Sequence, residues 1–187
     1  SLTVTECRDI IPAAEKNNKV LQVGTQMRHN IGYAELAGQI HNGLIGSILY
    51  AWVHFFRVDW LKLFENPEED ERKNWRMKQS QSGGINCEQG IQLFDLFNWF
   101  INSAPEEITS IGGINNSKLE KRDSWDHSGL VVRYANDALL TNGSNLYSCG
   151  GPGPNCLFGD KSSLSIRPTR SGAKVMQYQR TYWRPFG

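Results

Sequence analysis

The chain has 187 residues, with 20 Lys and Arg against 19 Asp and Glu, 39% hydrophobic residues and 11% aromatic residues. This composition is typical of a globular protein, and the length suits one domain, or one domain with part of another. Its net charge of +1 comes from interspersed residues, whereas nucleic acids and membrane surfaces attract a concentrated field of one sign. We therefore expect neither as a partner.

The sequence contains no run of about 18 apolar residues, which excludes a transmembrane helix. Its first residues also lack the basic and apolar pattern of a signal peptide. The sequence leaves the compartment open and favours the cytoplasm over the periplasm.

Four cysteines are too few and too scattered for a disulfide scaffold. Cys149 and Cys156 lie in a turn-rich loop that could close a small disulfide or hold two free thiols. Neither the cysteines nor the four histidines have the paired spacing of a zinc site. We therefore expect no metal.

The first elements form half of an α/β repeat. Residues 1–18 have apolar positions at helical spacing, with Thr3 or Thr5 as a possible N-cap. Residues 20–24 then form a short apolar run typical of a strand buried on both faces. Such a unit cannot stand alone, because a lone strand leaves its backbone groups unpaired.

The rest of the chain predicts a different layout. A second helix is expected over residues 31–42, ending at Asn42 and Gly43. The acidic residues 65–72 are interpreted as a solvated loop. Alternating and β-branched patterns predict strands over residues 47–58, 105–114, 128–134, 139–147, 155–159 and 162–167. The order favours an α+β fold with an open sheet covered by helices, and a boundary between Gly24 and Ile31.

Residues 82–100 predict a buried helix with one polar stripe. Glu88, Gln92 and Asp95 stand at positions i, i+4 and i+7, so they share a face. Buried polar groups need partners, so the stripe either completes a structural network or faces a cleft. Gly83 and Gly84 precede the helix and allow a close approach by backbone or ligand.

These residues resemble a known signature. The pattern Gly83-Gly84-x-x-x-Glu88-x-Gly90-x-Gln92-x-x-Asp95 is similar to Gly-Gly-x-x-x-Asp-x-Gly-x-His-x-x-Asp of the glucose-fructose oxidoreductase and inositol dehydrogenase (Gfo/Idh/MocA) family. Residues 20–28, Val-Leu-Gln-Val-Gly-Thr-Gln-Met-Arg, also resemble that family's last Rossmann strand and its exit.

The resemblance implies a two-domain NAD(P)-dependent oxidoreductase that acts on a sugar, inositol or related polyol. Residues 1–28 would be the C-terminal remnant of the Rossmann domain. Residues 29–187 would be an α/β domain that binds substrate and forms a homodimer or homotetramer through an open, largely antiparallel sheet. NAD or NADP would be bound mainly by residues upstream of Ser1, where the family's Gly-rich loop and catalytic Lys are expected. By itself, this fragment would be inactive.

Two departures from the signature concern catalysis. The family's His, which handles the substrate hydroxyl proton, aligns with Gln92, and its Asp aligns with Glu88. A neutral amide accepts no proton at a useful pH, so Gln92 can only orient the substrate by hydrogen bonding. Glu88 or the upstream Lys would carry the proton.

Other residues have a functional and a structural interpretation each. Gln26 and Arg28 leave the last Rossmann strand and could contact the cofactor, or form a salt bridge at the domain junction. Trp75 and Arg76 could wall a polyol site or anchor a loop. The resemblance also places Gly84 and Asp95 at the substrate. Asp126 and His127 come just before a strand, where His127 could reach the cleft as an alternative proton carrier, although such a pair more often forms a strand-end hydrogen bond.

Three functions remain open at this point. The first is the dehydrogenase. The second is a nicotinamide-dependent glycosidase, in which transient oxidation leaves no net redox change. The third is a non-catalytic sugar-binding or dimerisation subunit, because the family's His is replaced by Gln92.

Overall fold

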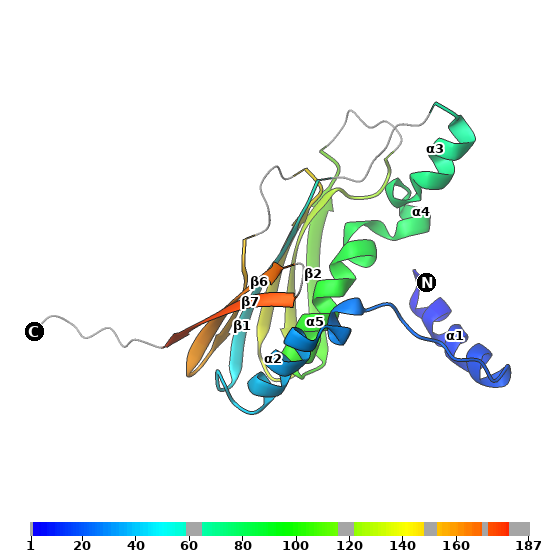
Figure 1. Cartoon of the computed structure of the whole chain (residues 1–187). Coiled ribbons are helices and arrows are strands. Elements are labelled where there is room, and N and C mark those ends of the chain that lie inside the picture. Colours follow the sequence, from blue (N-terminus) through cyan, green and yellow to red (C-terminus); the bar gives the residue numbers. More distant parts are fainter. Residues whose placement is uncertain (1, 59–64, 116–121, 148–152, 170–171, 180–187) are drawn as a thin grey trace, which may run out of the picture.

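The structure, a computed structural model, describes residues 2–58, 65–115, 122–147, 153–169 and 172–179 (Figure 1). Its α-helices are α1 (Val4–Lys16), α2 (Ile31–His41), α3 (Pro67–Lys73), α4 (Gln79–Ser82) and α5 (Ile91–Ile101). Shorter turns are η1 (Gln26–His29), η2 (Trp75–Met77) and η3 (Asn86–Gly90). The strands are β1 (Ile48–Phe56), β2 (Pro105–Gly113), β3 (His127–Tyr134), β4 (Leu139–Asn145), β5 (Asn155–Gly159), β6 (Ser162–Thr169) and β7 (Gly172–Gln179).

The seven described strands form one sheet in the order β2-β3-β4-β1-β5-β6-β7. Only β1 and β4 are paired in parallel, and every other neighbouring pair is antiparallel. This arrangement confirms the predicted α+β fold with an open, largely antiparallel sheet.

Helices α2 and α5 cover one face of the sheet (Figure 1). Helix α2 begins where Asn30 caps the backbone N–H groups of Gly32 and Tyr33 and ends at Asn42, as predicted. Helix α5 buries Leu93, Phe97 and Phe100, which pack against alternate strand residues in one core. The core thus holds α5, which carries Gln92 and Asp95 of the polar stripe, against the sheet, while Glu88 lies in η3 just before it.

The opposite face of the sheet carries exposed apolar side chains. Trp52 of β1 is 50% exposed and Met176 of β7 is 48% exposed. The strand register aligns these two with Val131 of β3, which is 45% exposed, in one row across the sheet. No described helix packs on this face (Figure 1).

The structure contradicts the strand predicted over residues 20–24. These residues have no regular structure, and Val20 is 98% exposed and Val23 68% exposed. The physical reason is that an apolar strand forms only beside neighbouring strands, and none of the described strands lies next to it. Helix α1 is present, with a capping box between Thr3 and Glu6, but buries no residue.

The acidic loop predicted over residues 65–72 was also wrong, because Pro67–Lys73 form the helix α3. Asn66 caps it by accepting from the N–H groups of Glu68 and Glu69. Asp70 in this helix is buried rather than solvated.

Strand β7 was not predicted. The question of whether Cys149 and Cys156 form a disulfide or two free thiols involves Cys149, which lies outside the described part of the chain.

Candidate functional site

The polar stripe of the buried helix meets the segment that connects α1 to α2. The guanidinium Nε of Arg28 donates to Oδ2 of Asp95 at 2.6 Å, and a second nitrogen donates to the Asp95 carbonyl at 3.3 Å. The same guanidinium lies 5.2 Å from the centre of the Trp99 ring. Charge, hydrogen bonds and the aromatic face together fix this contact.

Gln92 makes the second contact with the same segment. Its Nε2 donates to the carbonyl of Gly24 at 3.1 Å. Gly24 precedes η1 and Arg28 lies within it, so the exit segment is held against α5 at two points. The structure therefore unites Gly24, Arg28, Gln92 and Asp95, which the sequence analysis placed in two separate motifs.

Glu88 completes the stripe and is the most heavily bonded of the three. Its Oε1 accepts from Nε of Arg76 at 2.9 Å, and its Oε2 accepts from the amide of Gln89. The carboxylate is only 14% exposed. Arg76 also lies over the Trp75 ring, 4.5 Å from its centre. Glu88, Trp75 and Arg76 thus form one cluster at the start of the helix.

The glycine pair has a backbone role. Gly83 ends α4 with φ of 68°, and Gly84 follows with φ of 78°, in the left-handed region that favours glycine. A Cβ at Gly84 would lie 3.0 Å from the Gln79 side chain, and one at Gly83 would lie 2.8 Å from Cys87. The pair lets the chain turn tightly from α4 into η3.

His127 lies away from this stripe. Its neighbour Ser128 points to the helix layer, where its hydroxyl donates to Asn86, and successive side chains of a strand alternate between faces. His127 therefore lies on the other face of the sheet, with Nδ1 2.7 Å from the buried carboxylate of Asp126 and its ring near Tyr147. This is the strand-end hydrogen bond considered in the sequence analysis.

Gln26 lies in η1 with an exposed side chain. Gln26 and Arg28 were both predicted to contact the cofactor and lie in the same exit segment. Their surroundings differ, because Gln26 is exposed whereas Arg28 contacts Asp95. Arg28 is 39% exposed and bound to Asp95, which corresponds to the salt-bridge interpretation.

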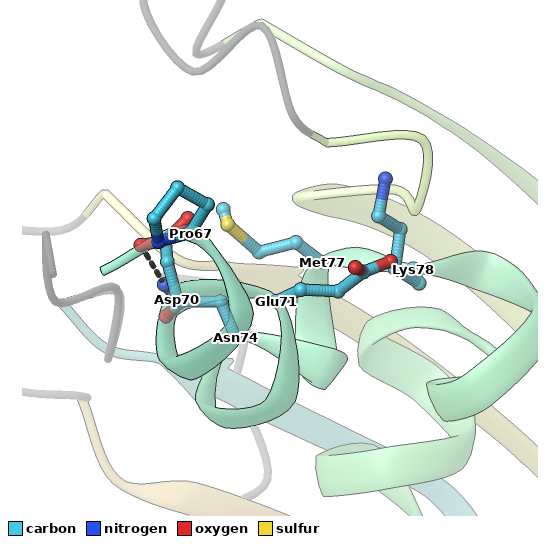
Figure 2. Close-up of a pocket in the computed structure, with 6 residues that line it drawn as sticks. All are labelled: Pro67, Asp70, Glu71, Asn74, Met77 and Lys78. Atoms are coloured by element: carbon cyan, nitrogen blue, oxygen red, sulfur yellow. Dashed lines mark hydrogen bonds between the residues drawn. The ribbon is translucent and has the colours of Figure 1, made fainter. Parts of the chain in front are cut away.

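Three surface hollows lie elsewhere. Figure 2 shows one of about 200 Å³ beside α3, lined by Pro67, Asp70, Glu71, Asn74, Met77 and Lys78. In it Oδ1 of Asp70 accepts from the amide of Asn74 at 2.9 Å. The other two hollows have volumes of about 320 and 300 Å³. The first lies beside α2, and the second lies at the start of β1. None of the residues that line these three hollows is a predicted site residue, although Asn74 and Met77 are adjacent in sequence to Trp75 and Arg76.

Burial shifts the pKa of several buried groups outside the stripe, among them Tyr134 and His54. Burial raises the pKa of Tyr134 to about 12, and its hydroxyl donates to Asn98 at 2.5 Å. Burial lowers the pKa of His54, although its hydrogen bond to the Pro154 carbonyl opposes the shift. His54 lies between Trp52 and Phe56 on the uncovered face of the sheet.

Among the described residues, no group of three or more His, Cys, Asp or Glu side chains is placed to hold a metal ion. No helix in this part of the chain is long and apolar enough to cross a membrane.

Comparison with known proteins agrees with the fold. Residues 33–165 match the family model of the GFO/IDH/MocA C-terminal domain. The chain therefore belongs to the Gfo/Idh/MocA family, as its motif predicted.

Its relatives are oxidoreductases and related enzymes. An uncharacterized oxidoreductase of Streptococcus pneumoniae is 26% identical over 174 residues, which cover 81% of this chain and 45% of the relative. A 2,7-anhydro-N-acetylneuraminate hydratase of Mediterraneibacter gnavus is 25% identical over 115 residues, covering 60% of this chain and 28% of the relative. The chain thus spans less than half the length of these curated relatives.

Solved structures share the fold at low identity. The aldose-aldose oxidoreductase of Caulobacter crescentus, complexed with glycerol, superposes with a TM-score of 0.76 at 18% identity, covering 100% of this chain and 55% of that one. The WlbA dehydrogenase of Bordetella pertussis, in complex with NADH and UDP-GlcNAcA, gives 0.73 at 16% identity, covering 92% and 51%.

Proposed function

We propose that the protein containing this chain is an NAD(P)-dependent oxidoreductase that transfers hydride between the cofactor and a sugar, inositol or related polyol. The observation that carries the proposal is the junction between the exit segment and α5. There Arg28 and Gly24 bind the side chains of Asp95 and Gln92, so the segment that resembles a Rossmann exit lies directly against the helix that carries the family's substrate motif.

In this proposal residues 1–28 are the end of a Rossmann domain and residues 29–187 are the substrate and dimerisation domain. The support is the unburied apolar surface of the first segment. Val4 is 69% exposed, Ile11 57% and Val23 68%. Apolar groups at helical and strand spacing gain free energy when another layer covers them, and the remaining Rossmann layers would do so.

The cofactor would meet this chain only at its edge. No Gly-x-Gly-x-x-Gly motif for the pyrophosphate occurs in the sequence, so most of the binding would come from preceding residues. Gln26 fits a role at the edge because it is an exposed residue of η1, and the exposed part of Arg28 offers positive charge. NAD or NADP supplies or accepts the hydride when bound.

The substrate would lie along the polar stripe. Glu88 and Gln92 would face it, with Trp75 and Arg76 at one end, Asp95 at the other and Gly84 at the helix start. An aromatic face suits sugar C–H groups, and a guanidinium suits hydroxyl oxygens. His127 lies on the other face of the sheet, which argues against a direct role for it.

Proton transfer in this site would differ from that of the family pattern. Gln92 is neutral and cannot carry the proton. Glu88 is ionisable. Each of its oxygens already accepts one hydrogen bond, and each keeps a second lone pair that can accept a proton. The catalytic Lys that the family places upstream is the other candidate. Glu88→Gln in the full-length enzyme separates them, because turnover survives only if Glu88 is not the base.

A second candidate is a reaction without net redox change, such as cofactor-assisted cleavage of a glycosidic bond. It is favoured by the relative named as a hydratase, since hydration leaves no net oxidation. Product analysis distinguishes the two: a dehydrogenase accumulates reduced nicotinamide, whereas the second reaction recycles it. Ligand binding without any turnover would instead indicate the non-catalytic subunit.

We further propose that a second copy of the chain covers the uncovered face of the sheet, giving a homodimer or homotetramer. Trp52, Val131 and Met176 lie in one row there and Tyr178 beside them is 50% exposed. An apolar patch of this kind marks an interaction surface, and a closed two-fold contact buries the same patch on both copies.

The direct test of the proposed function is the natural sequence that precedes Ser1. If about 100 to 150 further residues contain a strand, a Gly-x-Gly-x-x-Gly turn and a helix, the dehydrogenase proposal is supported. Absence of such a unit from the complete protein would contradict it.

A further inference from the structure

The turn η2 carries Trp75 and Arg76 but is too short to hold its own position. It spans only Trp75–Met77, and the hydrogen bonds within such a short 3₁₀ turn stabilise it weakly. Contacts from elsewhere in the chain therefore fix its place. They matter for the candidate site, because Nε of Arg76 donates from this turn to Glu88 at 2.9 Å.

A distant segment, residues 122–124, supplies these contacts. The hydroxyl of Ser124 donates to the backbone carbonyl of Arg76 at 3.0 Å. The backbone N–H groups of Asp123 and Ser124 both donate to the carbonyl of Met77, at 3.0 and 3.1 Å. Ser124 is fully buried, so the hydroxyl that holds the Arg76 backbone is itself fixed by the packing around it.

The same segment caps the helix that follows the turn. Oδ1 of Asp123 accepts from the N–H of Gln79, the first residue of α4, at 2.6 Å. Lys78, which precedes α4, has no acceptor in its side chain, so a carboxylate 44 positions away takes the place of an N-cap. The segment therefore binds the backbone of residues 76–79 at three points.

We propose that Ser124 and Asp123 are positioning residues of the candidate site, which hold residues 76–79 so that the guanidinium of Arg76 meets Glu88 beside the substrate. This inference rests on the proposed function, because it assumes that Arg76 faces a polyol. The Arg76 side chain is 42% exposed, so its own surroundings constrain it little. Apparent affinity falls with the fraction of molecules in which the site is assembled.

The test measures binding of D-glucose and myo-inositol to the full-length protein in complex with its nicotinamide cofactor. We expect Ser124→Ala to weaken binding of the probe by about fivefold, as the loss of one hydrogen bond predicts, and to leave cofactor binding unchanged. In an Arg76→Ala background, Ser124→Ala should have no further effect, because no guanidinium remains to be positioned. A merely structural support would show no such coupling.

Asp123 gives a second test at an exposed position, where a substitution leaves the core intact. Asp123→Ala should weaken probe binding as Ser124→Ala does, whereas Asp123→Asn keeps the acceptor oxygen and should bind like the unmodified protein. Ser162→Ala is the matched control, because Ser162 is also buried and donates to a backbone carbonyl, that of Leu44, at 3.3 Å. It should leave probe binding unchanged. Thermal unfolding checks that each variant is folded.

An equal effect of Ser124→Ala with and without the Arg76 side chain, or no effect in either background, would overturn the inference. Binding by Asp123→Asn as weak as that by Asp123→Ala would also overturn it for the cap. These results leave the proposed function intact. Failure of the unmodified protein to bind the cofactor and both probes would instead contradict the proposed function and the inference together.

Discussion

Arg28 is the residue that joins the two parts of the sequence motif. Its guanidinium binds both the side chain and the backbone carbonyl of Asp95 and lies over Trp99. The spacing of the stripe predicted that Asp95 shares a face with Gln92, because helical periodicity is local. Its partner could not be predicted, since Arg28 lies 67 positions away and only the fold brings it near.

Removal of this charge should loosen the exit segment. We expect Asp95→Asn to lower the free energy of unfolding by about 1 kcal/mol, because the pair is partly exposed and solvent screens it. Urea unfolding of the full-length protein measures this. The more exposed pair of Glu107 with Arg133, whose side chains are 70% and 40% exposed, is the matched control, and Glu107→Gln should change stability less than Asp95→Asn. Equal effects would show that the Arg28 contact has no special role.

His54 predicts a pH dependence of stability. Burial lowers its pKa in the folded state, so the unfolded chain binds a proton more readily. Stability contributed by neutral His54 is complete above the unfolded value of about 6.5 and is lost as the pH falls through the lowered folded pKa. His54→Phe keeps the ring contact with Phe56 and should reduce this loss. An unchanged pH profile of urea unfolding in the variant would contradict the account.

At the scale of elements, predictions succeeded where the signals are local. Caps and periodicity located α2 and α5, and turn residues located the hairpin before β4. The strand over residues 20–24 failed because its formation depends on neighbours. Strand β7 was not predicted because its apolar residues, such as Val175 and Met176, are exposed and do not alternate between buried and exposed positions. Helix α3 was not predicted because its acidic residues were interpreted as a solvated loop, although Asn66 and Pro67 are typical of a helix N-terminus.

The cap of α3 is open to test. Asn66→Ala removes the acceptor for two N–H groups of the first turn and should destabilise the helix by about 1 kcal/mol. Hydrogen exchange over residues 67–73 should then be faster. Asn66→Asp keeps the acceptor and should exchange like the unmodified protein; faster exchange in both variants would mean that capping is not the cause.

At the scale of the whole molecule, the sheet divides the protein into a covered and an uncovered side. Helices α2 and α5 bury one face (Figure 1), while the row of Trp52, Val131 and Met176 stays exposed. The site faces the helix side, so an assembly through the uncovered face would leave the polar stripe accessible.

A charge on the uncovered face should therefore break the assembly. We expect Trp52→Glu to convert the full-length protein from dimer or tetramer towards a smaller species, because a buried unpaired charge is costly. Ile31 is 75% exposed on the helix side, and Ile31→Glu is the control that should leave the mass unchanged. Analytical ultracentrifugation measures both. A Trp52→Glu variant with the original mass would place the interface elsewhere.

The central proposal is that this chain is the substrate half of a nicotinamide-dependent oxidoreductase. The most direct measurement incubates the full-length protein with NAD+ or NADP+ and a panel of sugars and inositols, and follows the reduced cofactor. We expect the unmodified protein to bind the cofactor and to reduce it with at least one polyol. In the double variant Glu88→Gln and Gln92→Leu, reduction should be lost while cofactor binding is retained. A full-length protein that binds neither NAD nor NADP would contradict the proposal.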